Sequence, residues 1–453
     1  MTQHSSESLS VGTRISYGAG NIGLQFLVAG MSFFLMIFYT DVALVPPAIA
    51  GAALLVGKIW DTINDPLFGW LADRTQSRHG RRRVYLIYGA VPLALAAAAI
   101  WWMPAGMSPL WAFVWIMLSY ALYDTMLTVV QLPYTALSAE LTSDYDERTR
   151  LVSYSSAGAL VGYVLGSVLL PKVAAQFTDE RTGFIVAGSL AGLVAGLSIG
   201  VVAWRIRERP KDTPESKTAD RESAADTPVL QSMRLVARNR PFLLLSFGAG
   251  LVRLGLTLVQ TALAYFVVYQ MQGTKADMPR YLGIMLLVVA ISLPIWKIVV
   301  QRWEKNLAYV VGLCCSAAGL MLLYGTTEGA TLRLYAVLVL FGIGMGAHWI
   351  APYAMVPDAV DHGNIRDKSN ITGIYFGVYG LIDKIARTIG TAIVPWVLAG
   401  TGYVANTAQT EHALEGIRWN ASVLPVLCFC LALPLLWRYP ITRASHQRLM
   451  DRS

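Results

Sequence analysis

Residues 205–241 read RIRERPKDTPESKTADRESAADTPVLQSMRLVARNRP, and this segment decides how the remainder of the chain is organised. It is a long polar stretch with nine basic and six acidic residues. Six apolar stretches lie on each side of it, each long enough for the roughly 20-residue helix that crosses a bilayer core. The twelve predicted spans are 15–40, 46–72, 84–105, 109–138, 151–173, 182–204, 242–270, 281–301, 306–325, 332–356, 371–399 and 421–438.

The bulk composition agrees with a chain whose main solvent is lipid. Of 453 residues, 55% are hydrophobic and 14% are charged, and the mean hydropathy is +0.50. The hydrophobic share is higher than in ordinary soluble domains, and the charged share is lower. If both termini are cytoplasmic, most of the 36 Lys and Arg residues fall on the cytoplasmic side, as positive-inside topology requires. The net charge of +8 then reflects topology, and nucleic acid is not an expected partner.

The predicted fold is an all-α membrane protein with twelve transmembrane helices in two six-helix halves. We expect an N-terminal half at 1–204, a cytoplasmic linker at 205–241 and a C-terminal half at 242–453. This is the layout of the major facilitator fold, in which substrates bind near the middle of the membrane between the halves. An unrelated twelve-span carrier is the alternative. We expect a monomer in a bacterial inner (cytoplasmic) membrane, surrounded by lipid.

Nothing in the polar segments suggests an enzyme. No nucleophile–base pair or metal cluster lies outside the apolar spans, and the four cysteines fall inside them, where they act as small apolar side chains. We therefore expect no cofactor and no metal beyond a possible Na⁺. In span 151–173, Gly158, Gly162 and Gly166 recur at spacing four, which predicts close packing against another helix.

Charged residues inside spans are costly, so they indicate function. The second span contains VGKIWDTINDPLFGWLADR, in which Lys58, Asp61 and Asp65 follow at steps of three and four. These steps place all three on one helical face, with Asn64 beside them. The two carboxylates repel each other unless a cation binds them or they share a proton. Either predicts a coupling site for Na⁺ or H⁺. The alternative is a structural role, with Lys58 neutralising Asp61 and Asp65 reaching a basic residue on another helix.

The eleventh span reads TGIYFGVYGLIDKIARTIGTAI. Lys384 and Arg387 are three residues apart and form a basic face, whereas Asp383 is turned about 100° from Lys384. A basic face at this depth predicts an anionic partner, either the substrate or the carboxylates of the second span. Arg253 in the seventh span raises the same question.

Two cytoplasmic segments carry opposite charges. GWLADRTQSRHGRRR follows the second span and ELTSDYDERTR follows the fourth. They could latch an inner gate, for which the candidate residues are Asp73, Arg74, Glu140 and Arg148. Alternatively, the basic run only fixes topology and the acidic one is a solvated loop.

Several segments resemble the glycoside-pentoside-hexuronide:cation symporter family, whose best-known member is melibiose permease. The resemblance covers both halves and rests on SYGAGN, FYTDV, KIWDTINDP, LPYTALSAEL, VPDAVDHGN and YFGVYGLIDK. It implies a cation site formed by Asp61, Asn64, Asp65 and Thr128. It also implies that Lys384 lies between the sugar and cation sites and that Trp349 lines the sugar pocket.

The sugar-binding residues depart from the melibiose permease pattern. Leu24 and Gln25 replace a Lys–Asp pair, Gln131 replaces an aspartate, Thr135 a tryptophan and Ser156 an arginine. Melibiose is therefore not the expected substrate. The candidate substrate-binding residues are Gln25, Gln131, Tyr134, Ser156, Trp349, Tyr353, Tyr379 and Lys384.

A second resemblance comes from YDTMLTVVQLPYTAL, with Asp124 before Thr125. This run is similar to animal sodium-dependent lysophosphatidylcholine transporters. The predicted function is secondary active symport of a small glycoside, pentoside or hexuronide-like solute with Na⁺ or H⁺. Transport of a lysophospholipid or another amphipathic solute is the alternative, and a non-transporting sensor is a further one.

Overall fold

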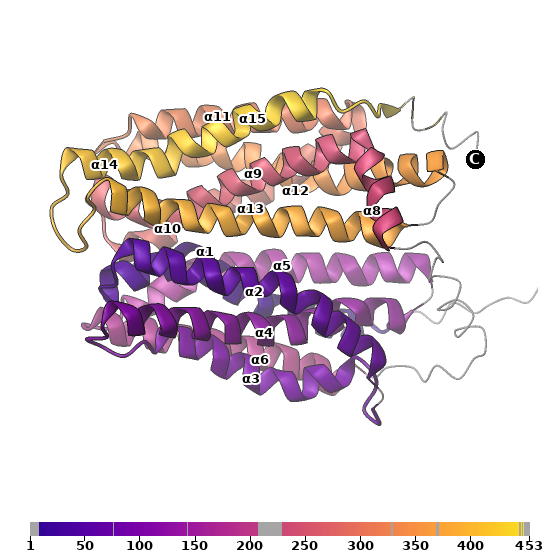
Figure 1. The fold of residues 1–453 in the computed structure, drawn as a ribbon, viewed down its shortest axis with the longest axis horizontal. Helices are drawn as coiled ribbons and strands as arrows, with labels where there is room; N and C mark the ends of the chain where they lie inside the picture. The colour runs from indigo at the N-terminus through magenta and orange to yellow at the C-terminus, as the bar shows by residue number, and fades with distance from the viewer. Residues whose placement is uncertain are drawn as a thin grey trace, which may run out of the picture. The chain divides into compact units, whose positions relative to one another are not determined.

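The structure is a computed structural model, and every regular element that it describes is a helix (Figure 1). Within helices, the side chains of a few residues are outside the described part. The described residues are 9–75, 77–142, 144–206, 229–327, 329–367, 371–443, 445 and 447. The prediction of an all-α chain is confirmed.

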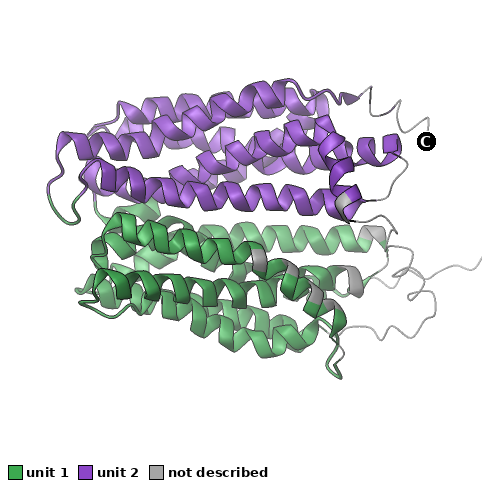
Figure 2. Ribbon diagram, in the orientation of Figure 1, with its two compact units in different colours: residues 1–211, 274–282, 404–407 green, residues 212–273, 283–403, 408–453 purple. Residues whose placement is uncertain are grey.

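The first compact unit comprises residues 1–211 together with 274–282 and 404–407 (Figure 2). The two short segments are held by side-chain contacts: Lys275 Nζ lies 2.5 Å from Glu180 Oε2, and Asn406 Nδ2 donates to the Asp41 carbonyl oxygen at 2.7 Å. The helices of this unit are α1 (Val11–Ile37) with the π-helical turn η1 (Phe38–Val42), α2 (Pro47–Arg74), α3 (Arg83–Trp101), α4 (Pro109–Leu141), α5 (Tyr145–Ala174) and α6 (Glu180–Arg205).

The second compact unit comprises residues 212–273, 283–403 and 408–453. It begins with the short α8 (Val229–Arg238), whose neighbour α9 starts at an Asn239 cap that accepts from the Phe242 amide. The later elements are α9 (Arg240–Tyr265) with η2 (Phe266–Gln270), α10 (Met278–Arg302) from residue 283 onward, α11 (Lys305–Tyr324), α12 (Thr331–Asp367), α13 (Thr372–Gly400), α14 (Glu411–Arg418), η4 (Trp419–Val423) and α15 (Leu424–Trp437). The short η3 (Lys275–Asp277) and the first turn of α10 belong to the first unit.

Among the described residues, ten helical segments are long and apolar enough to cross a membrane. Helices α2 and α13 are not among the ten, although they have 28 and 29 residues. Their central turns contain the charged residues that the sequence singles out as functional. The ten segments and these two helices lie at the positions of the twelve predicted spans.

Helices α1 and α5 pack with their backbones in direct contact. A Cβ atom built on Gly158, Gly162 or Gly166 would collide with a carbonyl oxygen of α1, at Gly18, Ile22 or Phe26 respectively. These collisions involve backbone atoms, which cannot rotate away as a flexible side chain could. The close approach predicted from the spacing of the glycines is therefore present, and its partner is α1.

We expect Gly162→Ala to destabilise the protein by about 1–3 kcal/mol, because the added methyl group overlaps the Ile22 carbonyl oxygen. The matched control is Gly200→Ala in α6, where a Cβ would meet nothing within 4 Å. There the higher helix propensity of alanine should leave stability equal or slightly raised. Thermal unfolding of the detergent-solubilised protein measures both. Equal shifts in the two variants would contradict the packing described here.

Candidate functional site

The α2 residues that the sequence selects lie at the contact between α2 and α4. Lys58, Asp61 and Asp65 are half-buried, and Asn64 is 0% exposed. The steps of three and four residues place them along the face of α2 that packs on α4. This contact is the polar seam of the first unit, because the side chains that meet across it bear charges, amides and hydroxyls.

Side-chain hydrogen bonds cross this α2–α4 seam. Thr128 Oγ1 donates to Asp65 Oδ1 at 2.9 Å, and Asn64 Nδ2 donates to Asp124 Oδ2 at 3.3 Å. One turn earlier on α2, Trp60 Nε1 donates to Thr125 Oγ1 at 2.9 Å. The bonds connect residues about 60 positions apart in sequence, so they fix the register of α2 on α4.

The amide of Asn64 is satisfied on one side only. Its Nδ2 faces a carboxylate of Asp124, which can only accept, so the orientation of the amide is set by chemistry. Its Oδ1 is buried and has no hydrogen-bond partner. A buried carbonyl oxygen without a partner costs about 1–3 kcal/mol. Such an atom fits a cation site, because a bound ion would supply the missing contact.

Lys58 is placed against an aromatic ring of α4. Its Nζ lies 5.9 Å from the centre of the Tyr120 ring, at the outer limit for a cation–π contact. The hydroxyl of Tyr123, on α4, lies within electrostatic range of the carboxylates of both Asp61 and Asp124. The seam thus holds one lysine and three aspartates, which leaves it acidic.

The described residues include no group of three or more His, Cys, Asp or Glu side chains arranged to hold a metal ion. A cation in the seam would therefore need the neutral oxygens of Asn64 and Thr128 as well as aspartates. Carboxylate, amide and hydroxyl oxygens are the ligands of hard cations rather than of transition metals. The donor set is compatible with an alkali cation.

Asp124 is a residue of this seam that was not included in the predicted cation site. The sequence indicates it only through a resemblance in YDTMLTVVQLPYTAL, as an acid preceding Thr125. In the structure its side chain is buried, with 6% exposure, and it holds the Asn64 amide. A signal was available, because Asp124 lies four residues before Thr128 and therefore on the same face of α4.

The second unit contains its own charged cluster, between α9 and α13. Asp383 Oδ1 accepts from Arg253 Nε at 2.7 Å, and Asp383 Oδ2 lies 2.9 Å from Arg387 Nη2. Arg253 comes from α9, and Arg387 follows Asp383 by one helical turn on α13. Both arginines whose partners the sequence left open thus share one carboxylate of their own unit.

A buried histidine lies near this cluster. His348 Nδ1 and the Tyr309 hydroxyl are 2.7 Å apart, and both residues are buried. The charges of Arg253 and Asp383 both act on the His348 ring. Tyr309 and His348 therefore add polar groups next to the cluster of Arg253 and Asp383.

Comparison with known proteins decides the family of this chain. Residues 16–443 match the family of MFS/sugar transport proteins. The chain belongs to this family. It is a multi-pass membrane transport protein and not an enzyme, as the sequence predicts.

Two relatives and one solved structure illustrate the breadth of the MFS/sugar transport family and its fold. The sodium-dependent lysophosphatidylcholine symporter 1 of Mus musculus is 26% identical over 98% of this chain and 88% of its own. The glucuronide carrier homologue of Escherichia coli (strain K12) is 25% identical over 98% of this chain and 95% of its own. The crystal structure of a D-xylose–proton symporter superposes with a TM-score of 0.70 at 14% identity, covering 95% of this chain and 98% of the other. The predicted major facilitator fold is confirmed.

The predicted substrate residues of this MFS/sugar transport protein are divided between the units. In the first unit, Gln25 and Gln131 are half-buried and Ser156 is exposed. In the second, Tyr353 is 71% exposed, whereas Trp349, Tyr379 and Lys384 are half-buried. Their role in binding substrate stays a prediction.

Tyr134 differs from the other predicted substrate residues because it is 3% exposed and bound to α1. Its ring stacks on Tyr17 with centroids 4.6 Å apart, and its hydroxyl donates to the Tyr17 carbonyl oxygen at 2.6 Å. In return, the Tyr17 hydroxyl donates to the Tyr134 carbonyl oxygen at 3.1 Å. These contacts give Tyr134 a structural task in addition to any contact with substrate.

The predicted gate is described only in part. Arg74 and Arg148 are exposed, while the side chains of Asp73 and Glu140 lie outside the described residues. Glu147, which is not among the predicted gate residues, forms an ion pair in this region. Its two carboxylate oxygens accept from Arg14 Nη2 at 2.9 and 2.8 Å, which joins the start of α5 to the start of α1.

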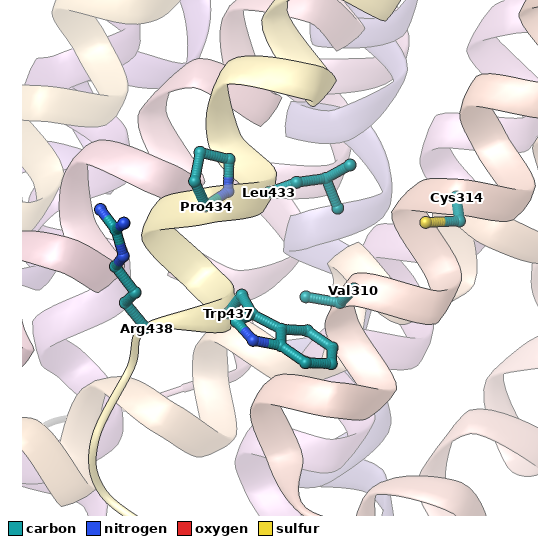
Figure 3. A pocket seen from close by; sticks show the side chains of 6 residues that line it. All are labelled: Val310, Cys314, Leu433, Pro434, Trp437 and Arg438. Carbon is teal, nitrogen blue, oxygen red and sulfur yellow. The ribbon is translucent and has the colours of Figure 1, made fainter.

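A pocket in the second unit lies between α11 and α15 (Figure 3). Apart from one arginine its lining is apolar, and it includes none of the predicted site residues. It therefore lacks the polar groups that a solute site needs. The pocket is lined by Val310, Cys314, Leu433, Pro434, Trp437 and Arg438.

Proposed function

We propose that this chain is a cation-coupled symporter that carries a small glycoside, pentoside or hexuronide-like solute by alternating access. The observation that carries the proposal is the buried carbonyl oxygen of Asn64, which has no partner and lies in an acidic seam. The names of the relatives support it, since they include a sodium-dependent symporter and a glucuronide carrier. Binding of the cation at the seam would favour binding of the solute, and each would raise the affinity for the other.

Na⁺ is the coupling ion that the seam favours, with H⁺ as the alternative. Na⁺ would be held by Asp61, Asn64, Asp65 and Thr128, which offer carboxylate, amide and hydroxyl oxygens. It would reduce the repulsion between the carboxylates and satisfy the Asn64 oxygen at once. A proton could neutralise one carboxylate, but it could not gather these different oxygens around one centre.

A lysophospholipid or another amphipathic solute is the second candidate substrate. It is favoured by the mouse relative, which is a lysophosphatidylcholine symporter by name, and by the placement of Asp124 in the seam.

For either substrate, we propose a monomer in a bacterial inner membrane, with both termini cytoplasmic and the halves 1–204 and 242–453 as the moving parts. The residues proposed to contact substrate are Gln25, Gln131, Tyr134, Ser156, Trp349, Tyr353, Tyr379 and Lys384, and those proposed to gate access are Asp73, Arg74, Glu140 and Arg148.

The test is uptake into proteoliposomes that contain the purified protein. A panel of glycosides, pentosides, uronides and lysolipids is offered under an inward Na⁺ gradient, an inward H⁺ gradient, or neither. We expect accumulation of one class of solute that depends on the Na⁺ gradient. Uptake that ignores both gradients would exclude symport, and binding without any uptake would indicate a sensor.

A further inference from the structure

The central turns of the two units carry opposite excess charge. In the α2–α4 seam of the first unit, three aspartates stand against one lysine. In the α9–α13 cluster of the second unit, the single carboxylate of Asp383 contacts both Arg253 and Arg387. A cation is the natural ligand of the first cluster. By the same reasoning, the natural ligand of the second cluster is an anion.

We propose that Arg253 and Arg387, held around Asp383, form an oxyanion-binding site in the second unit. The site would take the carboxylate or phosphate group of the transported solute. This inference rests on the proposed transport function and narrows its substrate to solutes that carry an oxyanion.

The stoichiometry of the contacts is the first argument. Asp383 is the only acid to which the described structure joins these two arginines, and it uses one oxygen for each, at 2.7 and 2.9 Å. One carboxylate cannot neutralise two guanidinium groups. Because an unbalanced charge in a membrane-spanning segment costs several kcal/mol, the cluster as a whole is stabilised by one additional anion.

The donors that remain are the second argument. A guanidinium group has five N–H donors, and each contact with Asp383 uses one of them. The planar guanidinium matches the two oxygens of a carboxylate or phosphate, which an ammonium group cannot do. The side chain of Arg387 is 47% exposed and that of Arg253 is 28% exposed, so a ligand can approach both.

The role of Asp383 follows from this geometry. It orients both guanidinium groups and lowers the cost of burying them while no solute is bound. Tyr353 and Tyr379 lie within electrostatic range of Arg253 and offer hydroxyl donors at the same cluster. The site is thus partly neutralised, which allows an oxyanion to bind and to leave.

Two pairs of solutes test the proposal and separate its two possible ligands. The first pair is 4-nitrophenyl β-D-glucuronide and 4-nitrophenyl β-D-glucoside, which differ in a carboxylate. The second pair is a lysophosphatidate and the monoacylglycerol with the same acyl chain, which differ in a phosphate. We expect the oxyanion member of one pair to have a KM roughly tenfold or more below that of its neutral partner.

The diagnostic variant is Arg387→Gln, because Asp383 keeps its contact with Arg253 and the fold should survive. We expect it to raise the KM of the oxyanion solute roughly tenfold or more and to leave the neutral partner unchanged. Arg387→Lys should retain only part of the preference, since it keeps the charge but loses the planar fork. Arg150→Gln is the control, since Arg150 also contacts a carboxylate but is 61% exposed on α5.

The outcomes distinguish this inference from the proposed function. Equal KM values within both pairs, or an Arg387→Gln variant that changes both members alike, would overturn the oxyanion site while leaving symport intact. If no solute is carried under any gradient, the proposed transport function fails. The oxyanion site is then tested by ligand binding alone. In that case glucuronate or lysophosphatidate, but not glucose or monoacylglycerol, should protect the solubilised wild type against heat, and Arg387→Gln should abolish the protection.

Discussion

Asp65→Asn is expected to abolish Na⁺-driven uptake, with a loss of at least about a hundredfold, while the protein still folds. The substitution removes a charge from the proposed cation site but keeps an oxygen that can accept the Thr128 hydroxyl, which now donates to Asp65 at 2.9 Å. The α2–α4 register should therefore survive. A carboxylate close to a cation contributes several kcal/mol at low effective dielectric, so its loss outweighs the other effects.

Initial rates of solute uptake in proteoliposomes, measured against Na⁺ concentration, check this prediction. Asp61→Asn should act in the same direction. Glu411→Gln is the matched control, since it removes a carboxylate of which 70% is exposed and which pairs with Arg418 outside the seam. An Asp65→Asn variant that still accumulates solute along the Na⁺ gradient would remove Asp65 from the coupling site.

Asn64→Leu is expected to weaken the apparent Na⁺ affinity about tenfold or more at saturating solute. Leucine fills a similar volume but removes the buried Oδ1 that has no protein partner, so the ion loses a neutral ligand. It also releases Asp124 from its amide donor, which is 3.3 Å away. Folding should be affected less than ion binding, because an unsatisfied carbonyl disappears along with the hydrogen bond.

The second unit offers a closely matched control in Asn420. It is also 0% exposed, its Nδ2 donates to the Val394 carbonyl oxygen at 3.2 Å, and its Oδ1 is also buried without a partner. It forms no hydrogen bond with a carboxylate. Asn420→Leu should therefore change thermal stability without altering the dependence of uptake on Na⁺. If both variants shift that dependence equally, Asn64 has no special role at the ion.

Local periodicity was enough to predict the arrangement on α2. Steps of three and four residues bring Lys58, Asp61 and Asp65 to one helical face, and this holds in any tertiary context. The same reasoning on α13 separated Asp383 from Lys384 by about 100°. It could have paired Asp383 with Arg387, four residues later, which is the contact that the structure contains.

Contacts between helices could not be predicted in this way. The Asn64–Asp124 bond joins residues 60 apart, and the Arg253–Asp383 pair joins residues 130 apart. Each depends on which faces of two helices meet and at what register, and hydrophobicity alone does not specify this for helices surrounded by lipid. The stacking of Tyr134 on Tyr17 could not be predicted for the same reason. From the sequence alone, Tyr134 is equally compatible with contacting a substrate and with packing against another helix.

Helices α2 and α13 must be apolar enough to lie in the membrane and yet contain the charged residues that function requires. Ten helical segments among the described residues are apolar enough to cross a membrane by hydropathy alone, and α2 and α13 are not, because they contain charged residues. Both were nevertheless predicted from the sequence, as the apolar stretches 46–72 and 371–399. The charges that make a span hard to recognise by hydropathy are the ones that point to ion and substrate sites.

The contact between α1 and α5 also limits how this transporter can move. Helices shift along one another when interdigitated side chains between them can exchange partners. At Gly158, Gly162 and Gly166 no side chain separates the helices, and backbone rests directly on backbone. The α1–α5 pair therefore has no layer of side chains along which the two helices could slide, and we expect it to move as one rigid body. The opening and closing of any solute path must then take place at other helix contacts.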